Sequence, residues 1–155
     1  MKKIFLIIMI SLFTVSEGYG MSLFDIGKIC LFSEVNGQVL LNGKPLANTI
    51  VKQQYIWGQK PVERMVKTDA EGNFKFDAVF VRSLAKYMPV EAVIQQEIII
   101  ENNKEEYKGW SSVKRNFDEN GELAGREINI LCELTNEFRS EEIGLNLIQG
   151  ICRWK

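Results

Sequence analysis

The 155-residue sequence contains no histidine. Because imidazole is the usual base beside a serine or cysteine nucleophile, this absence excludes the common Ser-His and Cys-His catalytic arrangements. It also excludes zinc sites that combine histidine with cysteine ligands. The sequence therefore predicts a protein that is not an enzyme and that carries no catalytic residue, metal ion or other cofactor.

The chain also lacks an excess of charge of either sign, with 19 lysines and arginines against 20 aspartates and glutamates. A nucleic-acid surface needs clustered basic side chains, so we expect no nucleic-acid partner. Adjacent acidic pairs occur only in polar, loop-like stretches: Glu105-Glu106, Asp118-Glu119 and Glu141-Glu142. A glycosidase would need two acids facing one cleft, so these pairs indicate solvated surface, and a carboxylate-based hydrolase is the least favoured alternative. The segment from Asp118 to Glu122 lacks the alternating ligand positions of a calcium loop.

Long apolar runs are scarce, and the clearest one, Ile4 to Val15, follows Lys2-Lys3. This run is too short to span a hydrocarbon core of about 30 Å but is typical of a signal peptide. Small residues near Gly20 suit cleavage there, so we predict a signal peptide over 1–20 and a single domain over 21–155. The prediction implies a periplasmic or secreted protein with no stable membrane insertion after cleavage. An uncleaved anchor helix, or a true start at Met21, is the alternative.

Cysteine is also scarce, with three residues at Cys30, Cys132 and Cys152. In an exported protein an even subset should oxidise, leaving one thiol over. We expect a disulfide between Cys132 and Cys152, because the segment from Thr135 to Ile151 has weak periodicity and needs a covalent tie. Pairing of Cys30 with Cys152 is the rival, and a reactive thiol is less favoured.

Turn-forming residues divide the chain after residue 30 into short β-prone segments. Asn42-Gly43 is the strongest two-residue hairpin signal and predicts a strand over 37–41, a tight turn and a second strand over 49–56. The stretch KTDAEGNFKF predicts another hairpin, in which the Asp69 side chain accepts hydrogen bonds from amides ahead of it and Gly72 takes the left-handed conformation.

The second half of the chain continues this pattern. A third hairpin is predicted from 93–101 and 105–110, Asn120-Gly121 marks a turn, and the alternation over 128–134 predicts a closing core strand. The segment RSLAKYM, 82–88, ends at a proline and predicts about two turns of helix as a crossover. About six to eight short strands with regular turns favour an all-β, Greek-key β-sandwich with one short crossover helix.

The region from Gly37 to Phe76 carries the pattern G-x-V, then G-x-P-x-x-x-x-x-V, then T-D-x-x-G-x-F. This pattern resembles that of carboxypeptidase-regulatory-like, or transthyretin-like, domains, and the resemblance implies their prealbumin-like β-sandwich. Asn48 stands where these domains usually have glycine, and asparagine tolerates the same backbone region. The familiar enzyme of this fold, the hydroxyisourate hydrolase, would require histidines that this chain lacks.

Three further stretches, ICLFSEVNGQV, FVRSLAKYMPVE and ILCELTNE, resemble a narrower family of uncharacterised bacterial domains with the same fold. Some proteins of that type lie near secreted antibacterial toxins. The resemblance implies a role in immunity or in interactions at the cell envelope.

Aromatic side chains and one arginine are the candidate binding groups: Tyr55, Trp57 and Arg82. They lie near strand ends or at the crossover, and Tyr, Trp and Arg are enriched at interface hot spots. Core packing is the alternative role for Trp57, and for Trp110 too. The sequence thus favours a non-enzymatic exported module that binds another protein, in its most concrete form an immunity protein that neutralises a secreted toxin. The alternative is a carbohydrate-binding module of the cell envelope with exposed aromatic rings as stacking platforms.

Overall fold

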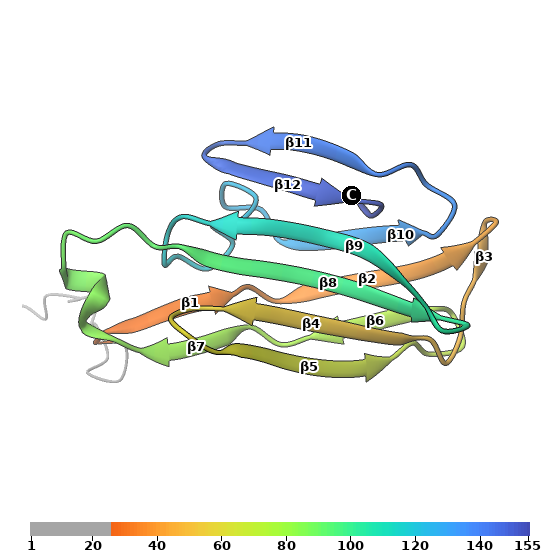
Figure 1. The fold of residues 1–155 in the computed structure, drawn as a ribbon, viewed down its shortest axis with the longest axis horizontal. Helices are drawn as coiled ribbons and strands as arrows, with labels where there is room; N and C mark the ends of the chain where they lie inside the picture. The colour runs from red at the N-terminus through yellow and green to blue at the C-terminus, as the bar shows by residue number, and fades with distance from the viewer. Residues whose placement is uncertain (1–25) are drawn as a thin grey trace, which may run out of the picture.

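The computed structural model describes residues 26–155, which form short β-strands in two facing layers (Figure 1). This architecture confirms the predicted all-β sandwich. The predicted signal peptide, 1–20, lies outside the described residues. Among the residues that are described, no helix is long and apolar enough to cross a membrane.

One layer is a six-stranded sheet in the order β11-β12-β9-β8-β4-β5. Its strands are β4 (Ile50–Ile56), β5 (Pro61–Lys67), β8 (Ile94–Asn102), β9 (Glu105–Lys114), β11 (Arg139–Ile143) and β12 (Asn146–Gly150). All of the strand pairs within this sheet are antiparallel.

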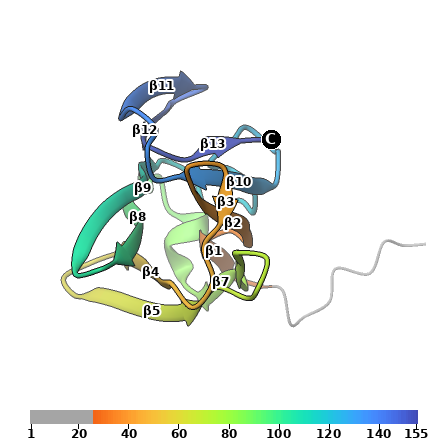
Figure 2. The ribbon, with the colours of Figure 1, turned by 90° about the vertical axis from the view of Figure 1, so that its right-hand side faces the viewer.

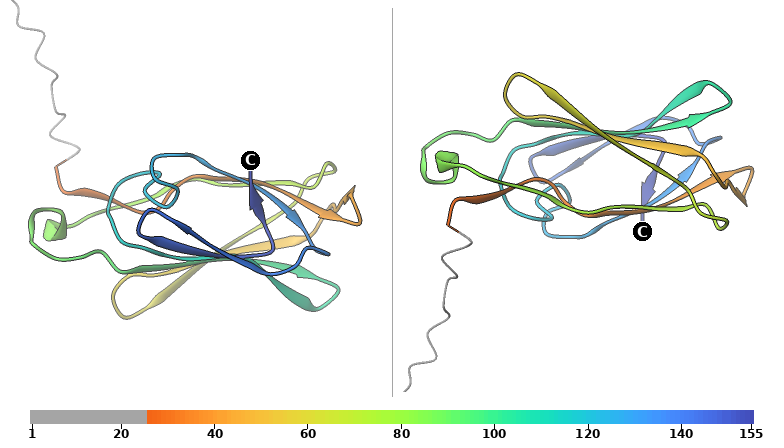
Figure 3. Two further views of the ribbon diagram at one scale, coloured as in Figure 1. Left: turned by 90° about the horizontal axis from the view of Figure 1, so that it is seen from above. Right: turned by 90° about the horizontal axis from the view of Figure 1, so that it is seen from below.

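The facing layer contains a sheet in the order β13-β10-β2-β3, with β6 also paired to β2, and a separate pair, β1 with β7. Its strands are β1 (Lys28–Phe32), β2 (Val35–Leu41), β3 (Lys44–Pro45), β6 (Asn73–Phe76), β7 (Val79–Arg82), β10 (Ile128–Glu133) and β13 (Arg153–Trp154). β2 and β10 run parallel. The chain crosses repeatedly from one layer to the other and forms only a few strands in a layer before it crosses again. Figures 2 and 3 show the two layers edge-on, from above and from below.

The core lies between the layers and has two parts. The larger cluster joins side chains of β2, β6 and β10 to those of β4, β8 and β9, with Trp110 only 1% exposed. Core packing is therefore the role of Trp110. The smaller cluster lies at one end of the sandwich and consists of Ile29, Leu31, Ala92 and Ile94.

The turn at Asn42-Gly43 forms as predicted, with φ of 52° and 74°, but the strand expected after it does not pair with β2. Only Lys44 and Pro45 return along β2, and β4 instead pairs with β5 and β8 in the opposite layer. Proline has no amide hydrogen to extend the ladder. Asn48, with φ of 58°, then turns the chain across, which confirms that asparagine takes the left-handed conformation here.

The second predicted hairpin is also a corner between layers. Asp69 Oδ1 accepts hydrogen bonds from the amides of Glu71 (3.0 Å) and Asn73 (2.7 Å), and Gly72 has φ of 76°, so the predicted turn is correct. The strands on either side diverge, because β5 pairs with β4 whereas β6 pairs with β2. The physical reason is burial: Phe74 and Phe76 point into the core, while β5 is an edge strand with mostly exposed side chains.

The third hairpin, β8 with β9, and the core strand β10 confirm the predictions. The crossover segment differs from the predicted two turns of helix over 82–88, because only Leu84–Tyr87 is helical and forms a single 3₁₀ turn (η2). Ser83 Oγ accepts from the Ala85 amide (3.1 Å) at the start of this turn, and Pro89 follows shortly after its end.

β10 is not the last strand. The segment with weak periodicity forms the β11–β12 hairpin, and β13 follows it. The predicted disulfide between Cys132 and Cys152 is confirmed, which leaves Cys30 as a free, buried cysteine.

Candidate binding site

Two of the predicted binding residues, Tyr55 and Trp57, are half-buried. Both pack against the smaller core cluster, and the Trp57 ring meets Phe117 edge-to-face with centroids 6.4 Å apart. Arg82 is exposed on β7, opposite Lys28 of β1. The two aromatic side chains thus belong partly to the core, and their role in binding stays a prediction.

Exposed apolar side chains gather on the crossover, on the adjoining strand β7 and on the segment that leads to β8. We call this set the crossover patch: Phe80, Leu84, Tyr87, Met88, Val90 and Val93, which are between 38% and 75% exposed. η2 projects at one end of the sandwich, the same end that the β4–β5 loop reaches after Trp57 (Figure 1). Apolar exposure concentrated on one segment of a small domain is typical of an interaction surface.

The crossover is held in place by hydrogen bonds to the start of β1. The Ser83 amide donates to Gly27 O (2.8 Å), and the Gly27 amide donates to the Tyr87 hydroxyl (3.0 Å). Lys86 Nζ donates to Lys28 O at 3.3 Å. These contacts fix the backbone of the patch while its apolar side chains face outward.

Basic side chains flank the crossover patch. Lys28 Nζ lies 4.2 Å from the centre of the Phe80 ring, a cation–π contact, and Lys86 and Arg82 lie on the adjoining turn and strand. Glu91, which follows Val90 of the patch in the chain, forms an exposed ion pair with Arg115 at 2.8 Å. Asp118 and Glu119 line the same hollow as Lys28, Phe80 and Lys86, so the edge of the patch carries charges of both signs.

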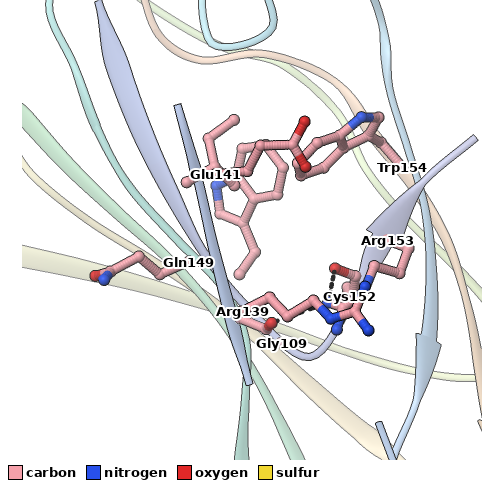
Figure 4. Close-up of a pocket in the computed structure, with 10 residues that line it drawn as sticks. Gly109, Arg139, Glu141, Gln149, Cys152, Arg153 and Trp154 are labelled. Carbon is pink, nitrogen blue, oxygen red and sulfur yellow. Dashed lines mark hydrogen bonds between the residues drawn. The ribbon is translucent and has the colours of Figure 1, made fainter. Parts of the chain in front are cut away.

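A small pocket, separate from the crossover patch, lies between the β11–β12 hairpin and β13. Figure 4 shows Glu141 and Trp154 on one side of it, with Arg139, Arg153 and Cys152 on the other. Arg153 donates to three backbone carbonyls, those of Gly150 (3.0 Å), Cys152 (2.9 Å) and Glu137 (2.6 Å). Desolvation, together with the nearby Arg139, lowers the pKa of Arg153. The pocket offers an indole ring and charged groups of both signs.

The interior contains a polar cluster, formed by Ser33, Gln96, Lys114, Glu122 and Asn146, each at most 4% exposed. Lys114 Nζ lies 3.2 Å from Glu122 Oε2. The Glu122 carboxylate also accepts from the Ser33 amide (3.0 Å), the Ser33 hydroxyl (2.6 Å) and Gln96 Nε2 (2.8 Å). Breaking a buried ion pair of this kind would leave an uncompensated charge, so these groups act as a unit.

The polar cluster borders Cys30, whose Sγ lies 3.7 Å from Ser33 Oγ. Burial raises the pKa of the Cys30 thiol, against the opposing effect of Lys114. The thiol is therefore protonated at neutral pH and is a poor nucleophile. Across residues 26–155, no group of three or more His, Cys, Asp or Glu side chains is arranged to hold a metal ion.

Sequence reasoning did not identify the crossover patch or the polar cluster. The patch was missed because Leu84, Tyr87 and Met88 were assigned to a short crossover helix over 82–88, and their exposure was not considered. The burial of Lys114 could have been predicted, because side chains alternate between the two faces of β9 and Lys114 therefore shares the inward face with Trp110 and Ser112. The burial of Glu122 could not be predicted in this way, because Glu122 follows a turn and lies outside any regular strand.

The fold and this surface define an all-β sandwich with an exposed apolar end. The chain belongs to the family DUF6795, a domain of unknown function, whose model matches residues 35–137. No curated protein matches the chain. The matched region includes the whole crossover patch, but it ends before the β11–β12 hairpin.

Proposed function

We propose that this protein is a non-enzymatic, exported module that binds another protein through the crossover patch. The observation that carries the proposal is the exposure of the patch, led by Leu84 at 75%, on a backbone that hydrogen bonds hold to β1. Surface apolar residues that are ordered and contiguous favour protein contacts over simple solvation.

The most concrete form of this function is immunity, in which the protein neutralises a secreted antibacterial toxin in the periplasm. The resemblance of three stretches of the sequence to a narrower family of uncharacterised bacterial domains, some of which lie near such toxins, supports this form. The predicted signal peptide and the disulfide are both consistent with an oxidising compartment. Trp57 and Arg82 lie at the same end as the patch and extend the proposed interface.

Site-specific photo-crosslinking tests the protein-binding proposal. A photoreactive residue replaces Leu84 in the patch or, as the matched control, Leu145 at the β11–β12 turn, which is 83% exposed. We expect position 84 to capture one defined protein in cells and position 145 to capture none. Equal adducts at both positions, or none at position 84, would contradict the proposal.

Immunity is tested separately with a secreted toxin encoded beside the gene. We expect co-production of this protein to restore growth, and Leu84→Asp to weaken toxin binding by at least about 2 kcal/mol, as for a hot-spot residue. Leu145→Asp is the control and should bind normally. Unaltered protection by Leu84→Asp, with an unchanged melting temperature, would exclude the crossover patch as the toxin-binding surface.

Carbohydrate binding is the second candidate, and the pocket beside β13 favours it. Trp154 offers a ring for stacking on a sugar, and Arg139 and Glu141 offer hydrogen-bonding groups around it. Titration of envelope glycans against the protein and against Trp154→Ala, followed by calorimetry, distinguishes the two candidates. Binding that depends on Trp154 and not on Leu84 would favour the carbohydrate module.

A further inference from the structure

The edge strand β11 carries charged residues at two positions where a sandwich usually has apolar ones. Side chains alternate along a strand, so Arg139 and Glu141 share one face of β11 with the buried Ile143. That face turns toward the opposite layer, and in most sandwiches it is apolar. In this chain Arg139 and Glu141 instead line the small pocket beside β13 (Figure 4).

Arg153, on the same side of the pocket as Arg139, is held in place by the backbone around it. Its guanidinium donates to the carbonyls of Gly150 (3.0 Å), Cys152 (2.9 Å) and Glu137 (2.6 Å). The preceding residue is tied to β10 by the disulfide. A guanidinium has five N–H groups and these bonds use three of them, which leaves two for a ligand. The position of Arg153 is therefore set before a ligand binds.

Arg139 supplies a second positive charge at this place. Within residues 26–155, its side chain forms no hydrogen bond and no ion pair. Desolvation is the main cause of the lowered pKa of Arg153, and the charge of Arg139 is the second, ahead of the opposing effects of Glu137 and Glu141. The two guanidinium groups thus repel each other, and an anion between them would relieve that repulsion.

The size of the pocket limits what can enter it. Its volume is about 60 Å³. One water molecule needs about 10–15 Å³ of such space, so the pocket has room for about four or five heavy atoms. A carboxylate with the carbon atom that bears it fits this space, whereas a whole sugar ring does not. The rest of a ligand would lie outside, against the half-buried indole of Trp154.

We propose that this pocket binds the carboxylate of an acidic sugar, with Arg139 and Arg153 as the hydrogen-bond donors. A guanidinium fork matches the two oxygens of a carboxylate. The sugar ring stacks on Trp154, whose indole is held in one orientation by its edge-to-face contact with Trp110. This flat ring beside the arginines favours a sugar over an acidic peptide. The inference rests on the second candidate function, carbohydrate binding, and is independent of the crossover patch.

Calorimetric titration of the wild-type protein tests the proposal with three probes: methyl β-D-glucuronide, the neutral methyl β-D-glucoside and triglutamate. We expect the glucuronide to bind at least about tenfold more tightly than the glucoside, with an affinity that falls as salt is added. Equal binding of the glucoside would overturn this inference and leave the carbohydrate candidate standing. Preference for triglutamate would overturn both. Binding of none of the probes would also overturn both, and the charges of β11 would then serve only to protect a sheet edge.

Matched variants assign the roles. Arg139→Gln should weaken binding of the glucuronide by about tenfold or more, because it removes a charge-assisted hydrogen bond, while the melting temperature stays unchanged. Glu141→Gln should strengthen binding, because it removes a like charge beside the ligand. The control is Arg126→Gln, which alters the net charge equally at an exposed residue that does not line the pocket. Unchanged affinity in Arg139→Gln, or an equal loss in Arg126→Gln, would overturn the assignment.

Discussion

At the scale of single residues, the Asp69 turn shows how a short side chain directs the backbone. The carboxylate accepts from two backbone amides and from Asn73 Nδ2 (3.1 Å), and the Gly72 amide bonds the Asp69 carbonyl (3.1 Å). The hydrogen bond from the Asn73 amide, more than any other contact, lowers the pKa of Asp69 below its usual 3.8. The charged form is therefore favoured by folding.

This shift predicts a pH dependence of stability. A folded-state pKa that lies below the unfolded one adds stability that is present above the unfolded pKa and is lost as the pH falls through the folded pKa. We expect the wild type to be more stable than Asp69→Asn at neutral pH, and the difference to shrink below about pH 4. Urea unfolding of both proteins between neutral pH and acid measures it. A difference that is constant over this range would contradict the role of the charge.

Much at this scale could be predicted from the sequence, because turn chemistry is local. Asp69, Gly72 and Asn48 have the backbone roles that their side chains suggest. The buried role of Glu122 could not be predicted, because its partners Ser33 and Gln96 are distant in the chain and only the fold brings them together. The same holds for the crossover patch, since exposure depends on what packs nearby.

At the scale of elements, the predicted strands were largely right and their pairing was partly wrong. β8 and β9 pair through a short turn, as local signals imply. The turn at Asp69 leads into a strand of the opposite layer, and the turn at Asn42-Gly43 leads only into the short β3, after which the chain crosses to β4 in the opposite layer. Turn residues specify a change of direction, whereas the partner of a strand depends on burial along its whole length.

The disulfide is the clearest stabilising element of the C-terminal segment. It joins β10 to the residue before β13 across a sequence separation of 20. The Ile151 and Cys152 amides also donate to Lys108 O (3.1 Å) and Gly109 O (3.0 Å) of β9. The cross-link thus holds a short segment whose backbone hydrogen bonds are few.

Replacing both Cys132 and Cys152 by alanine should lower the free energy of unfolding by about 3 kcal/mol on the chain-entropy model. Denaturant unfolding measures the loss, and hydrogen exchange should show faster exchange at Ile151 first. Cys30→Ala, which leaves the disulfide in place, is the control and should cost less. Equal stability of the double variant and the wild type would refute a structural role for the bond.

At the scale of the whole molecule, the family match and the folding unit have different limits. The match ends at residue 137, whereas the larger core cluster includes Ile143, Ile148 and Ile151. β12 covers the edge of β9, and the Trp154 ring packs edge-to-face on Trp110 with centroids 6.4 Å apart. The residues beyond the matched region therefore complete the core of this chain.

A chain that ends at Glu137 should consequently fail to fold cooperatively. It would lose three buried isoleucines, leave Cys132 without its partner and uncover Trp110 beside the unpaired edge of β9. Each buried large aliphatic side chain contributes about 2 kcal/mol, so their combined loss is comparable to the whole stability of a small domain. Thermal melting, monitored by near-ultraviolet circular dichroism, measures the outcome.

The control ends at Cys152, keeps the disulfide and loses only β13, and it should melt cooperatively at a lower temperature than the full chain. A sharp transition in the chain that ends at Glu137, at the temperature of the full protein, would show that the matched region folds without the hairpin.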